Sequence, residues 1–359
     1  MRILFITAHK HLPELRGGME VNTHDLALRL IQRGVQVGVL CGLAGKGSVG
    51  FRARLHIKLL NKQCPMDRSL GYPVWRAWES EQHVHAVVEV FKPDAIVIQG
   101  GSKFDVLLAD ALRLQLPVFC YLHTQDLLPI EDDVLNNPLL NFISNSEFTC
   151  SLHPNKRFCG VVRPLILPEL YATMGSRNTA LFVNPAPHKG LGIVLALAAA
   201  RPDVPFVFAV NKSEVRASVA AEIHQLKLRN VELSGPVSDM RPLYRQAKIV
   251  LAPSQCQETW GRIATEAHFS DIPVLASSSG GLPEAVGPGG VCLPADAPES
   301  EWIRVFNRIW DEQDYYASLS DAAHRHSRRP EIAPDNIVES FIAMISRSPQ
   351  TIVDRVHMS

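Results

Sequence analysis

Short apolar runs alternate along the chain with longer segments in which apolar residues recur every three or four positions. Residues 3–8 form the first apolar run, and residues 20–33 follow with apolar side chains at helical spacing. Gly34 stands where a helix commonly ends, and the apolar run 35–40 comes next. A strand, a helix and a second strand in this order predict a βαβ unit with parallel strands.

The same alternation continues and then restarts in the second half of the chain. In the first half we expect further strands at 95–98, 117–122 and 142–144 and a helix at 106–114. In the second half we expect strands at 180–183, 206–210, 231–233, 249–252 and 273–276, each tied to a helix. The predicted fold class is therefore α/β, with two Rossmann-like, doubly wound parallel-sheet domains facing a central cleft.

The length of the chain and one proline-rich stretch predict where the domains divide. A chain of 359 residues is too long for a single hydrophobic core, so two domains are expected. Prolines and a glycine gather between residues 163 and 176, as in a linker. We therefore place the N-terminal domain at residues 1–165 and the C-terminal domain at 166–335. The last helix and tail, 336–359, are expected to return to the N-terminal domain.

Composition and charge narrow the classes of partner. Lys plus Arg and Asp plus Glu are equal at 36 each, which argues against a nucleic-acid partner. The first apolar run stops at His9, too early for a signal core, and no window reaches the length of a membrane-spanning helix. We therefore expect a cytoplasmic protein. Residues 51–62 are basic and amphipathic, so they could lie on the inner face of an anionic membrane or guide a lipid-linked acceptor; a solvated helix fits this segment equally well.

The segment from Glu258 to Glu266 carries the strongest candidate chemistry. We expect Glu258 at or just before the start of a helix whose first amides, from about Thr259 to Ile263, point into the cleft. With the helix dipole, these amides would form an anion site suited to a diphosphate. Glu266, about two turns later on nearly the same face, could accept two hydroxyls of a ribose. The alternative is an ordinary amphipathic helix with solvated glutamates.

These residues also carry a resemblance to a known family. Two glutamates separated by seven residues, within Pro-Ser-x-x-x-Glu-Thr-Trp-Gly, resemble the signature of the family 4 retaining glycosyltransferases of the GT-B fold, or glycosyl transferases group 1. Residues 277–286 are similar to that family's glycine loop, residues 290–293 also fit, and residues 233–254 resemble its nucleotide-base region. The resemblance extends over nearly the whole chain and is most specific in the second half.

The resemblance implies a role for each signature residue and a different substrate for each domain. Glu258 would face the donor sugar, and Glu266 would bind the ribose. Backbone donors to sugar and phosphate would come from Thr259, Trp260, Gly261 and Arg262. Gly280 and Gly281 would let the chain pass close to the ligand without a Cβ clash. The C-terminal domain would hold the nucleotide sugar, and the N-terminal domain would take the acceptor side.

Lys189 is the candidate cation for the donor diphosphate. We expect it to open a helix just after a strand, where its ammonium could reach the cleft. The family usually has Gly-Arg four or five residues before this Lys-Gly, whereas this chain has Asn184-Pro185. Arg262 and Arg163 are therefore the two candidates for the second cation. A solvated lysine at a helix start is the alternative for Lys189.

Two further candidates lie in the first half of the chain. Gly17 and Gly18 follow the first strand and match the family's N-terminal glycine loop, although a lone Gly-Gly is often only a turn. His123 ends an expected strand and resembles a histidine that contacts the donor sugar in this family, although a single histidine is more often structural.

The resemblance implies transfer of a hexose-like unit from a nucleoside diphosphate sugar, with retention of anomeric configuration, to a glycan, lipid-linked or small-molecule acceptor in cell-surface polysaccharide synthesis. No metal or other cofactor is expected, because the sequence holds neither His-Glu-x-x-His nor Asp-x-Asp. A sugar-nucleotide epimerase and a non-catalytic nucleotide-sugar-binding scaffold remain as alternatives. An oxidoreductase is disfavoured, because no Gly-x-Gly-x-x-Gly follows the first strand.

Overall fold

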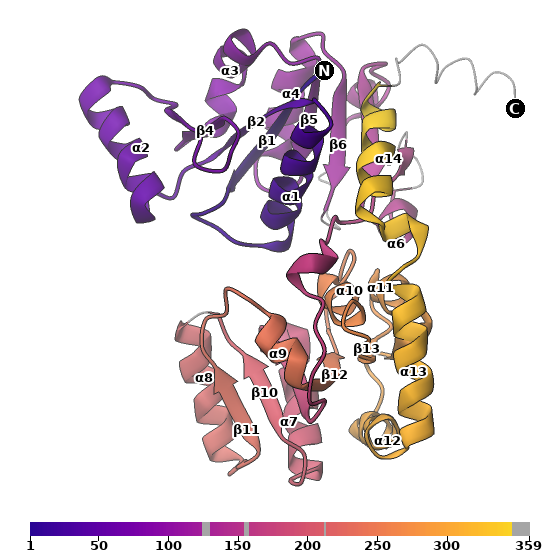
Figure 1. Cartoon of the computed structure of the whole chain (residues 1–359). Coiled ribbons are helices and arrows are strands. Elements are labelled where there is room, and N and C mark those ends of the chain that lie inside the picture. The colour runs from indigo at the N-terminus through magenta and orange to yellow at the C-terminus, as the bar shows by residue number, and fades with distance from the viewer. Residues whose placement is uncertain (124–129, 154–157, 212, 347–359) are drawn as a thin grey trace, which may run out of the picture. The chain divides into compact units, whose positions relative to one another are not determined.

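The computed structural model describes residues 1–123, 130–153, 158–211 and 213–346, and the chain divides into two compact units. The first unit is formed by residues 1–165 together with the helix that begins at Pro334, and the second by residues 166–333. Figure 1 shows the elements of both units in chain order. Each unit is described by itself below.

The first unit is built on an eight-stranded sheet with the order β3-β4-β2-β1-β5-β6-β7-β8. Its strands pair in parallel except β3 with β4. The central strands are almost wholly buried, as expected of a parallel sheet covered on both faces. The strands are β1 (Arg2–Lys10), β2 (Gln36–Gly42), β3 (Met66–Asp67), β4 (Val74–Ala77), β5 (Ala95–Gln99), β6 (Val118–Leu122), β7 (Leu140–Ser144) and β8 (Phe158–Val161).

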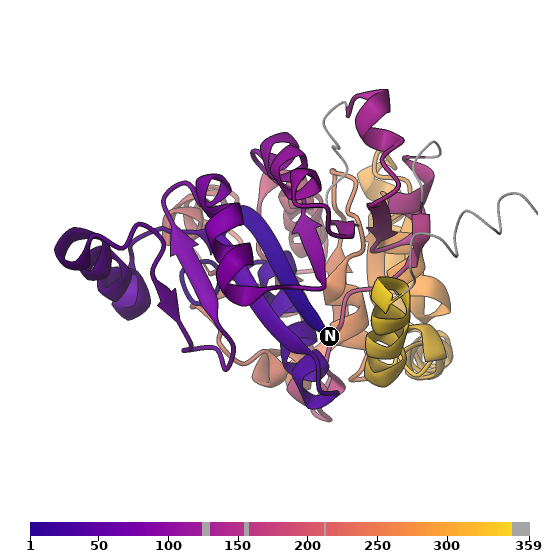
Figure 2. The ribbon, with the colours of Figure 1, turned by 90° about the horizontal axis from the view of Figure 1, so that it is seen from above.

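Helices complete the first unit, and the last of them comes from the end of the described chain. Helix α14 stacks Phe341 on Phe5 of β1, with ring centroids 5.9 Å apart. Arg33, just after α1, pairs with Asp335 and Glu339 of α14 at 2.6 and 2.9 Å. Figure 2 shows the same helix from above. The helices are α1 (Gly18–Gln32), α2 (Gly47–Leu60), α3 (Val84–Phe91), α4 (Phe104–Arg113), α5 (Asp132–Leu135), α6 (Glu147–Ser151) and α14 (Pro334–Ser346), with a 3₁₀ turn η1 (Ser80–His83).

The second unit has a six-stranded parallel sheet with the order β11-β10-β9-β12-β13-β14. Its strands are β9 (Thr179–Val183), β10 (Phe206–Ala209), β11 (Val231–Ser234), β12 (Ala247–Ala252), β13 (Val274–Ser277) and β14 (Gly290–Leu293). Its helices are α7 (Leu191–Ala200), α8 (Ser213–Gln225), α9 (Arg241–Gln246), α10 (Arg262–His268), α11 (Leu282–Val286), α12 (Glu299–Asp311) and α13 (Gln313–His326). Short 3₁₀ turns are η2 (Pro168–Leu170), η3 (Pro187–Lys189), η4 (Gly287–Gly289) and η5 (Pro330–Ile332). The predicted fold class, two Rossmann-like α/β domains with parallel sheets, is confirmed.

Each unit contains a buried histidine whose pKa is far below its ordinary value. Burial lowers the pKa of His11 in the first unit to about 3, helped by the charge of Arg76. Burial likewise lowers the pKa of His268 in the second unit to about 3, helped by His326 and Arg329. Below pH 6.5 the unfolded chain therefore takes up protons that the folded chain does not. The stability these histidines support is complete above that pH and is lost progressively as the pH falls toward 3.

We expect acidification to destabilise each unit through its buried histidine. Lowering the pH from about 7 to about 5.5 should lower the free energy of unfolding by about 1.3 kcal/mol per histidine. Urea unfolding at the two pH values measures this difference. In His11→Gln and His268→Gln the stability should change less between the two pH values than in the wild type. An unchanged pH dependence in both variants would contradict the assignment.

Candidate functional site

Glu258 lies in the loop after β12, at the carboxyl ends of two neighbouring strands of the second unit. It follows β12 and forms an isolated parallel bridge with Gly280, which follows β13. The N–H of Gly281 donates to the carbonyl of Glu258 at 2.5 Å. The Glu258 side chain is 19% exposed, so it is not a freely solvated carboxylate. Its position matches the edge at which open α/β sheets bind ligands.

The expectation that Glu258 stands at a helix start is wrong. Helix α10 begins at Arg262, after Gly261 in a left-handed conformation with φ of 91°. Between them, the Trp260 ring is buried and its indole N–H donates to Thr265 Oγ1 at 3.2 Å. The signature therefore has a loop part, which carries Glu258, and a helical part, which carries Glu266. Helix α10 begins three residues after Thr259, where its first turn was expected.

Gly280 and Gly281 are required by the segment that carries Glu258. Gly280 has a positive φ of 66°, and a Cβ there would collide with the backbone of Glu258. A Cβ on Gly281 would collide with the carbonyl of Thr259. Both glycines thus allow two loops to lie against each other. Their expected contact with the ligand stays a prediction.

Replacing Gly280 with alanine should displace this segment. We expect Gly280→Ala to lower the free energy of unfolding by at least about 1–2 kcal/mol, because the left-handed backbone and the clash both disfavour a Cβ. Gly192 in α7 is the matched control, since a Cβ there meets nothing within 4 Å. Gly192→Ala should raise stability by about 0.5–1 kcal/mol. Denaturant unfolding measures both, and a Gly280→Ala variant as stable as the wild type would overturn the geometric argument.

Lys189 is brought to Glu258 by the docking of two loops. It ends the 3₁₀ turn η3 and does not open a helix as expected, because α7 begins only at Leu191. The carbonyl of His188 accepts hydrogen bonds from the backbone N–H groups of Gln255 at 2.8 Å and Cys256 at 3.3 Å. These bonds hold the Lys189 loop on the loop that leads to Glu258. Lys189 Nζ donates to Glu258 Oε1 at 2.9 Å.

Gly190 makes this docking possible. It has a φ of 84°, and a Cβ at this position would collide with the carbonyl of Pro253. Glycine therefore lets the turn after Lys189 press against the end of β12. The pairing joins residues 69 positions apart in the sequence.

Glu266 is a buried, hydrogen-bonded carboxylate, which argues against the solvated alternative. It lies in α10, is 9% exposed, and accepts a hydrogen bond from Tyr244 Oη at 2.8 Å. Burial, and then the nearby charge of Glu266, raise the pKa of Tyr244 well above its ordinary value, so its hydroxyl stays protonated as a donor. Arg262 Nε lies 3.6 Å from the other oxygen of Glu266. The two oxygens of the Glu266 carboxylate therefore face a hydroxyl donor and a guanidinium.

The two arginines considered as the second cation are placed in different units. Arg262 stands in the first turn of α10 in the second unit and pairs with Glu266. Arg163 belongs to the first unit and pairs with Glu147 at 3.7 Å. Only Arg262 therefore shares a unit with Lys189 and Glu258.

The remaining candidates lie in the first unit, at the carboxyl ends of its parallel strands. Gly17 precedes α1 and Gly18 is its first residue, both after β1. His123 follows β6 and is half-buried, with its ring centroid 4.1 Å from that of Tyr121. The structure thus places these residues on the first unit, and Glu258, Lys189 and Glu266 on the second.

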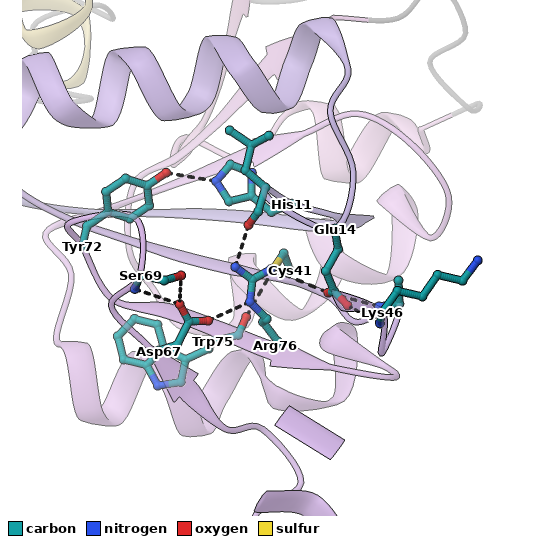
Figure 3. Close-up of polar contacts among 11 residues, drawn as sticks. His11, Glu14, Cys41, Lys46, Asp67, Ser69, Tyr72, Trp75 and Arg76 are labelled. Atoms are coloured by element: carbon teal, nitrogen blue, oxygen red, sulfur yellow. Dashed lines mark hydrogen bonds and ion pairs between the residues drawn. The ribbon is translucent and has the colours of Figure 1, made fainter. Parts of the chain in front are cut away.

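A buried ionic cluster, which the sequence reading missed, holds the loop before Gly17 (Figure 3). Arg76 of β4 is 1% exposed; its Nε donates to Asp67 Oδ2 at 2.8 Å and its terminal nitrogen to the carbonyl of Leu12 at 2.7 Å. The buried carboxylate of Glu14 lies 3.7 Å from the same guanidinium. The only sequence signal was a lone arginine inside an apolar strand.

The cluster continues through neighbouring polar groups. Burial acts to raise the pKa of Asp67, but hydrogen bonds from Ser69 and Arg76 outweigh it, and the net pKa lies below the ordinary value. The Tyr72 hydroxyl lies 3.0 Å from ring nitrogens of both His11 and His24. The loop between β1 and α1 is therefore fixed by polar contacts and is not a free glycine turn.

The part of the chain that the structure describes contains no cluster of three or more His, Cys, Asp or Glu side chains suited to a metal ion.

Comparison with known proteins identifies the family to which the chain belongs. Residues 16–149 match the Glycosyltransferase Family 4 domain, and residues 193–311 match the Glycosyl transferases group 1 domain. Together the two segments cover more than two thirds of the chain, one in each unit. Two Rossmann-like units with these domains define a protein of the GT-B class. The chain belongs to the family 4 glycosyltransferases, also described as glycosyl transferases group 1.

Curated relatives match over part of their length. The D-inositol 3-phosphate glycosyltransferase of Thermobispora bispora is 28% identical over 174 residues, which are 48% of this chain and 38% of the relative. The enzyme of the same name from Salinispora arenicola is 35% identical over 91 residues, 25% of this chain and 20% of the relative. The matched region thus spans less than half the length of these relatives.

Solved structures match over nearly the whole chain and show the fold. HepE of Anabaena, solved in complex with UDP and glucose, superposes with a TM-score of 0.73 at 21% identity, covering 97% of this chain and all of that chain. Sucrose-phosphate synthase of Thermosynechococcus elongatus superposes with a TM-score of 0.78 at 14% identity, covering 96% of this chain and 98% of the other.

Proposed function

We propose that this protein transfers a sugar from a nucleoside diphosphate sugar to an acceptor hydroxyl on a glycan, a lipid-linked sugar or a small molecule. In this proposal the second unit holds the donor, and the anomeric configuration is retained. The single observation that carries the proposal is the contact between Lys189 and Glu258, at the carboxyl ends of the strands of a family 4 fold. An ammonium and a carboxylate held 2.9 Å apart offer one charge to a diphosphate and the opposite charge to a donor sugar.

Each candidate site residue of the second unit then has a distinct role in the proposed reaction. The Lys189 ammonium has two N–H donors besides the one directed to Glu258, and these would meet the departing diphosphate. Arg262 and the first amides of α10 would add positive potential. Glu266, oriented by Tyr244, would accept the ribose hydroxyls. We propose that these groups stabilise the leaving group without a divalent ion.

The proposed chemistry is a reaction on one face of the sugar. The leaving phosphate oxygen would take the proton of the acceptor hydroxyl while the bond from that hydroxyl to the anomeric carbon forms. The protein would contribute positioning and electrostatics. His123, Gly17 and Gly18 would act from the first unit, on the sugar and at the entry of the acceptor. The UDP and UDP-glucose named for the HepE complexes support a nucleotide-sugar donor.

A thermal-shift screen against nucleoside diphosphate sugars tests the proposal. A true donor should stabilise the fold by mass action, by about 2.7 kcal/mol at a hundred times its Kd. The same donor should then be consumed only when an acceptor is added, with release of the nucleoside diphosphate. Stabilisation without turnover would favour the non-catalytic scaffold, and isomerisation of the donor without an acceptor would favour the epimerase. A screen in which none of the donors shifts the transition would contradict the proposal.

A further inference from the structure

Helix α2 of the first unit is attached to its domain along one narrow face. Val49, Gly50 and Ala53 are its buried residues, and Ile57 is half-buried. The other residues from Phe51 to Leu60 are exposed. In both views, Figures 1 and 2, α2 is the outermost helix of this unit, beyond β4. Most of its circumference thus faces away from the described part of the domain.

The outward face of α2 carries an apolar stripe. Phe51, Leu55 and Leu59 follow one another at four-residue spacing, which places them on one side of a helix. They are 52%, 37% and 71% exposed. Leu60, at the end of the helix, is also exposed. A run of large apolar side chains on one exposed helix face indicates an interaction surface.

The charged side chains of α2 itself are all basic. Arg52, Arg54 and Lys58 stand between the members of the stripe, and the Arg54 guanidinium lies 5.8 Å from the Phe51 ring centroid. No Asp or Glu occurs between Leu26 and Met66, although acidic and basic residues are equal over the whole chain. The local excess of positive charge therefore favours an anionic occupant.

An exposed tryptophan flanks the helix. Trp78 follows β4 and is 55% exposed. A Cβ on Gly45 would touch both the Trp78 ring and the Arg54 stem, so these two side chains are close neighbours. Tryptophan rings favour the level of lipid headgroups. No helix among the described residues has the length and apolar character needed to cross a bilayer, so any membrane contact of these helices is with its surface.

We propose that α2 and Trp78 form a docking surface for a membrane that contains anionic phospholipids. We call Phe51, Arg54, Leu55, Lys58, Leu59 and Trp78 the α2 surface. The helix would lie in the plane of the interface, with its apolar stripe in the acyl boundary and its basic side chains on lipid phosphates. Surface binding of this kind does not depend on the proposed sugar transfer. It would bring the first unit, which is the proposed acceptor side, to a lipid surface.

Co-sedimentation of the full chain with vesicles tests the docking surface. We expect binding to vesicles of phosphatidylcholine mixed with phosphatidylglycerol, weakened by salt, and little binding to phosphatidylcholine alone. R54Q/K58Q should reduce the partition coefficient about 30-fold, at about one kcal/mol for each basic residue. L55S/L59S should reduce it on the order of 100-fold. Both double variants should unfold at the wild-type temperature, because all four side chains are exposed.

Matched controls come from other exposed positions of the same unit. Val90 of α3 is 72% exposed, and Val90→Ser should leave vesicle binding unchanged. Arg113 at the end of α4 is equally exposed, and Arg113→Gln should also have no effect. Equal binding to both kinds of vesicle, or undiminished binding of the two α2 variants, would overturn the proposal. So would binding of α2 to an RNA or a protein in the absence of any binding to vesicles.

Discussion

Glu258→Ala is expected to lower the rate of sugar transfer by about a hundred- to a thousandfold while leaving nucleotide binding nearly intact. In the proposed reaction, positive charge would develop on the anomeric carbon as the diphosphate departs, and a fixed carboxylate beside that carbon would lower the barrier. The Glu258 side chain is suited to this task because Gly281, Gly280 and Lys189 hold its backbone and its carboxylate in place. Steady-state transfer kinetics and direct titration of the nucleoside diphosphate measure the two quantities.

Three variants separate an electrostatic role from a loss of folding. Glu258→Gln keeps the shape of the side chain but removes its charge, so its rate of sugar transfer should fall nearly as far as that of Glu258→Ala. Glu214 is an exposed glutamate at the start of α8, and Glu214→Ala should retain wild-type turnover. Combining Glu258→Ala with Lys189→Met should cost less than the sum of the two single effects, because the pair acts as a unit. Full activity of Glu258→Ala would remove this residue from the site.

Glu266→Gln is expected to weaken donor binding by about a hundredfold. Two charge-assisted hydrogen bonds to ribose hydroxyls would become neutral ones, at a cost of about 1–1.5 kcal/mol each. Glutamine is preferred to alanine here because its amide oxygen can still accept the hydrogen bond from Tyr244. Glu266→Ala would leave that buried hydroxyl without its acceptor and would also destabilise the fold. Isothermal titration calorimetry with the nucleoside diphosphate gives the change in Kd.

Tyr244→Phe is the control for this second prediction. It removes the hydroxyl that orients Glu266 but keeps the carboxylate and the aromatic packing, so it should weaken donor binding by less than about tenfold. The ordering of the two effects distinguishes a ligand-binding carboxylate from one that only supports the core. Unchanged Kd in Glu266→Gln would show that the ribose assignment is wrong.

The fold could be predicted from the sequence because its pattern is local and repeated. Apolar runs such as 95–98 and 249–252 alternate with helical periods, and this order alone indicates parallel sheets. The observed strands β5 and β12 contain these runs, with ends shifted by one or two residues. Glycines at loop ends and the signature glutamates then identified the family.

The local structure around Glu258 could not be predicted in the same way. Helical spacing between Glu258 and Glu266 indicated one continuous helix, but Gly261 takes a left-handed conformation and Trp260 is buried before the helix begins. The segment before Gly261 instead lies beside the loop after β13, and a parallel bridge between Glu258 and Gly280 connects the two. Pairing with a distant loop therefore overrode the local pattern.

Side-chain contacts between residues far apart in the chain also could not be predicted from the sequence. Tyr244 and Glu266 meet because α9 and α10 pack on the same sheet, and Lys189 meets Glu258 because two loops dock. Arg76 finds Glu14 and Asp67 only once β4 lies at its place in the sheet. Such contacts depend on tertiary structure and cannot be predicted from the spacing of residues along the chain.

A crystal structure of the protein with a bound nucleoside diphosphate sugar tests the central claim most directly. The account predicts ribose hydroxyls within hydrogen-bonding distance of the Glu266 carboxylate, the diphosphate at Lys189 and the first amides of α10, and the sugar beside Glu258. A nucleotide bound away from these groups, with both carboxylates making no contact to it, would contradict the account.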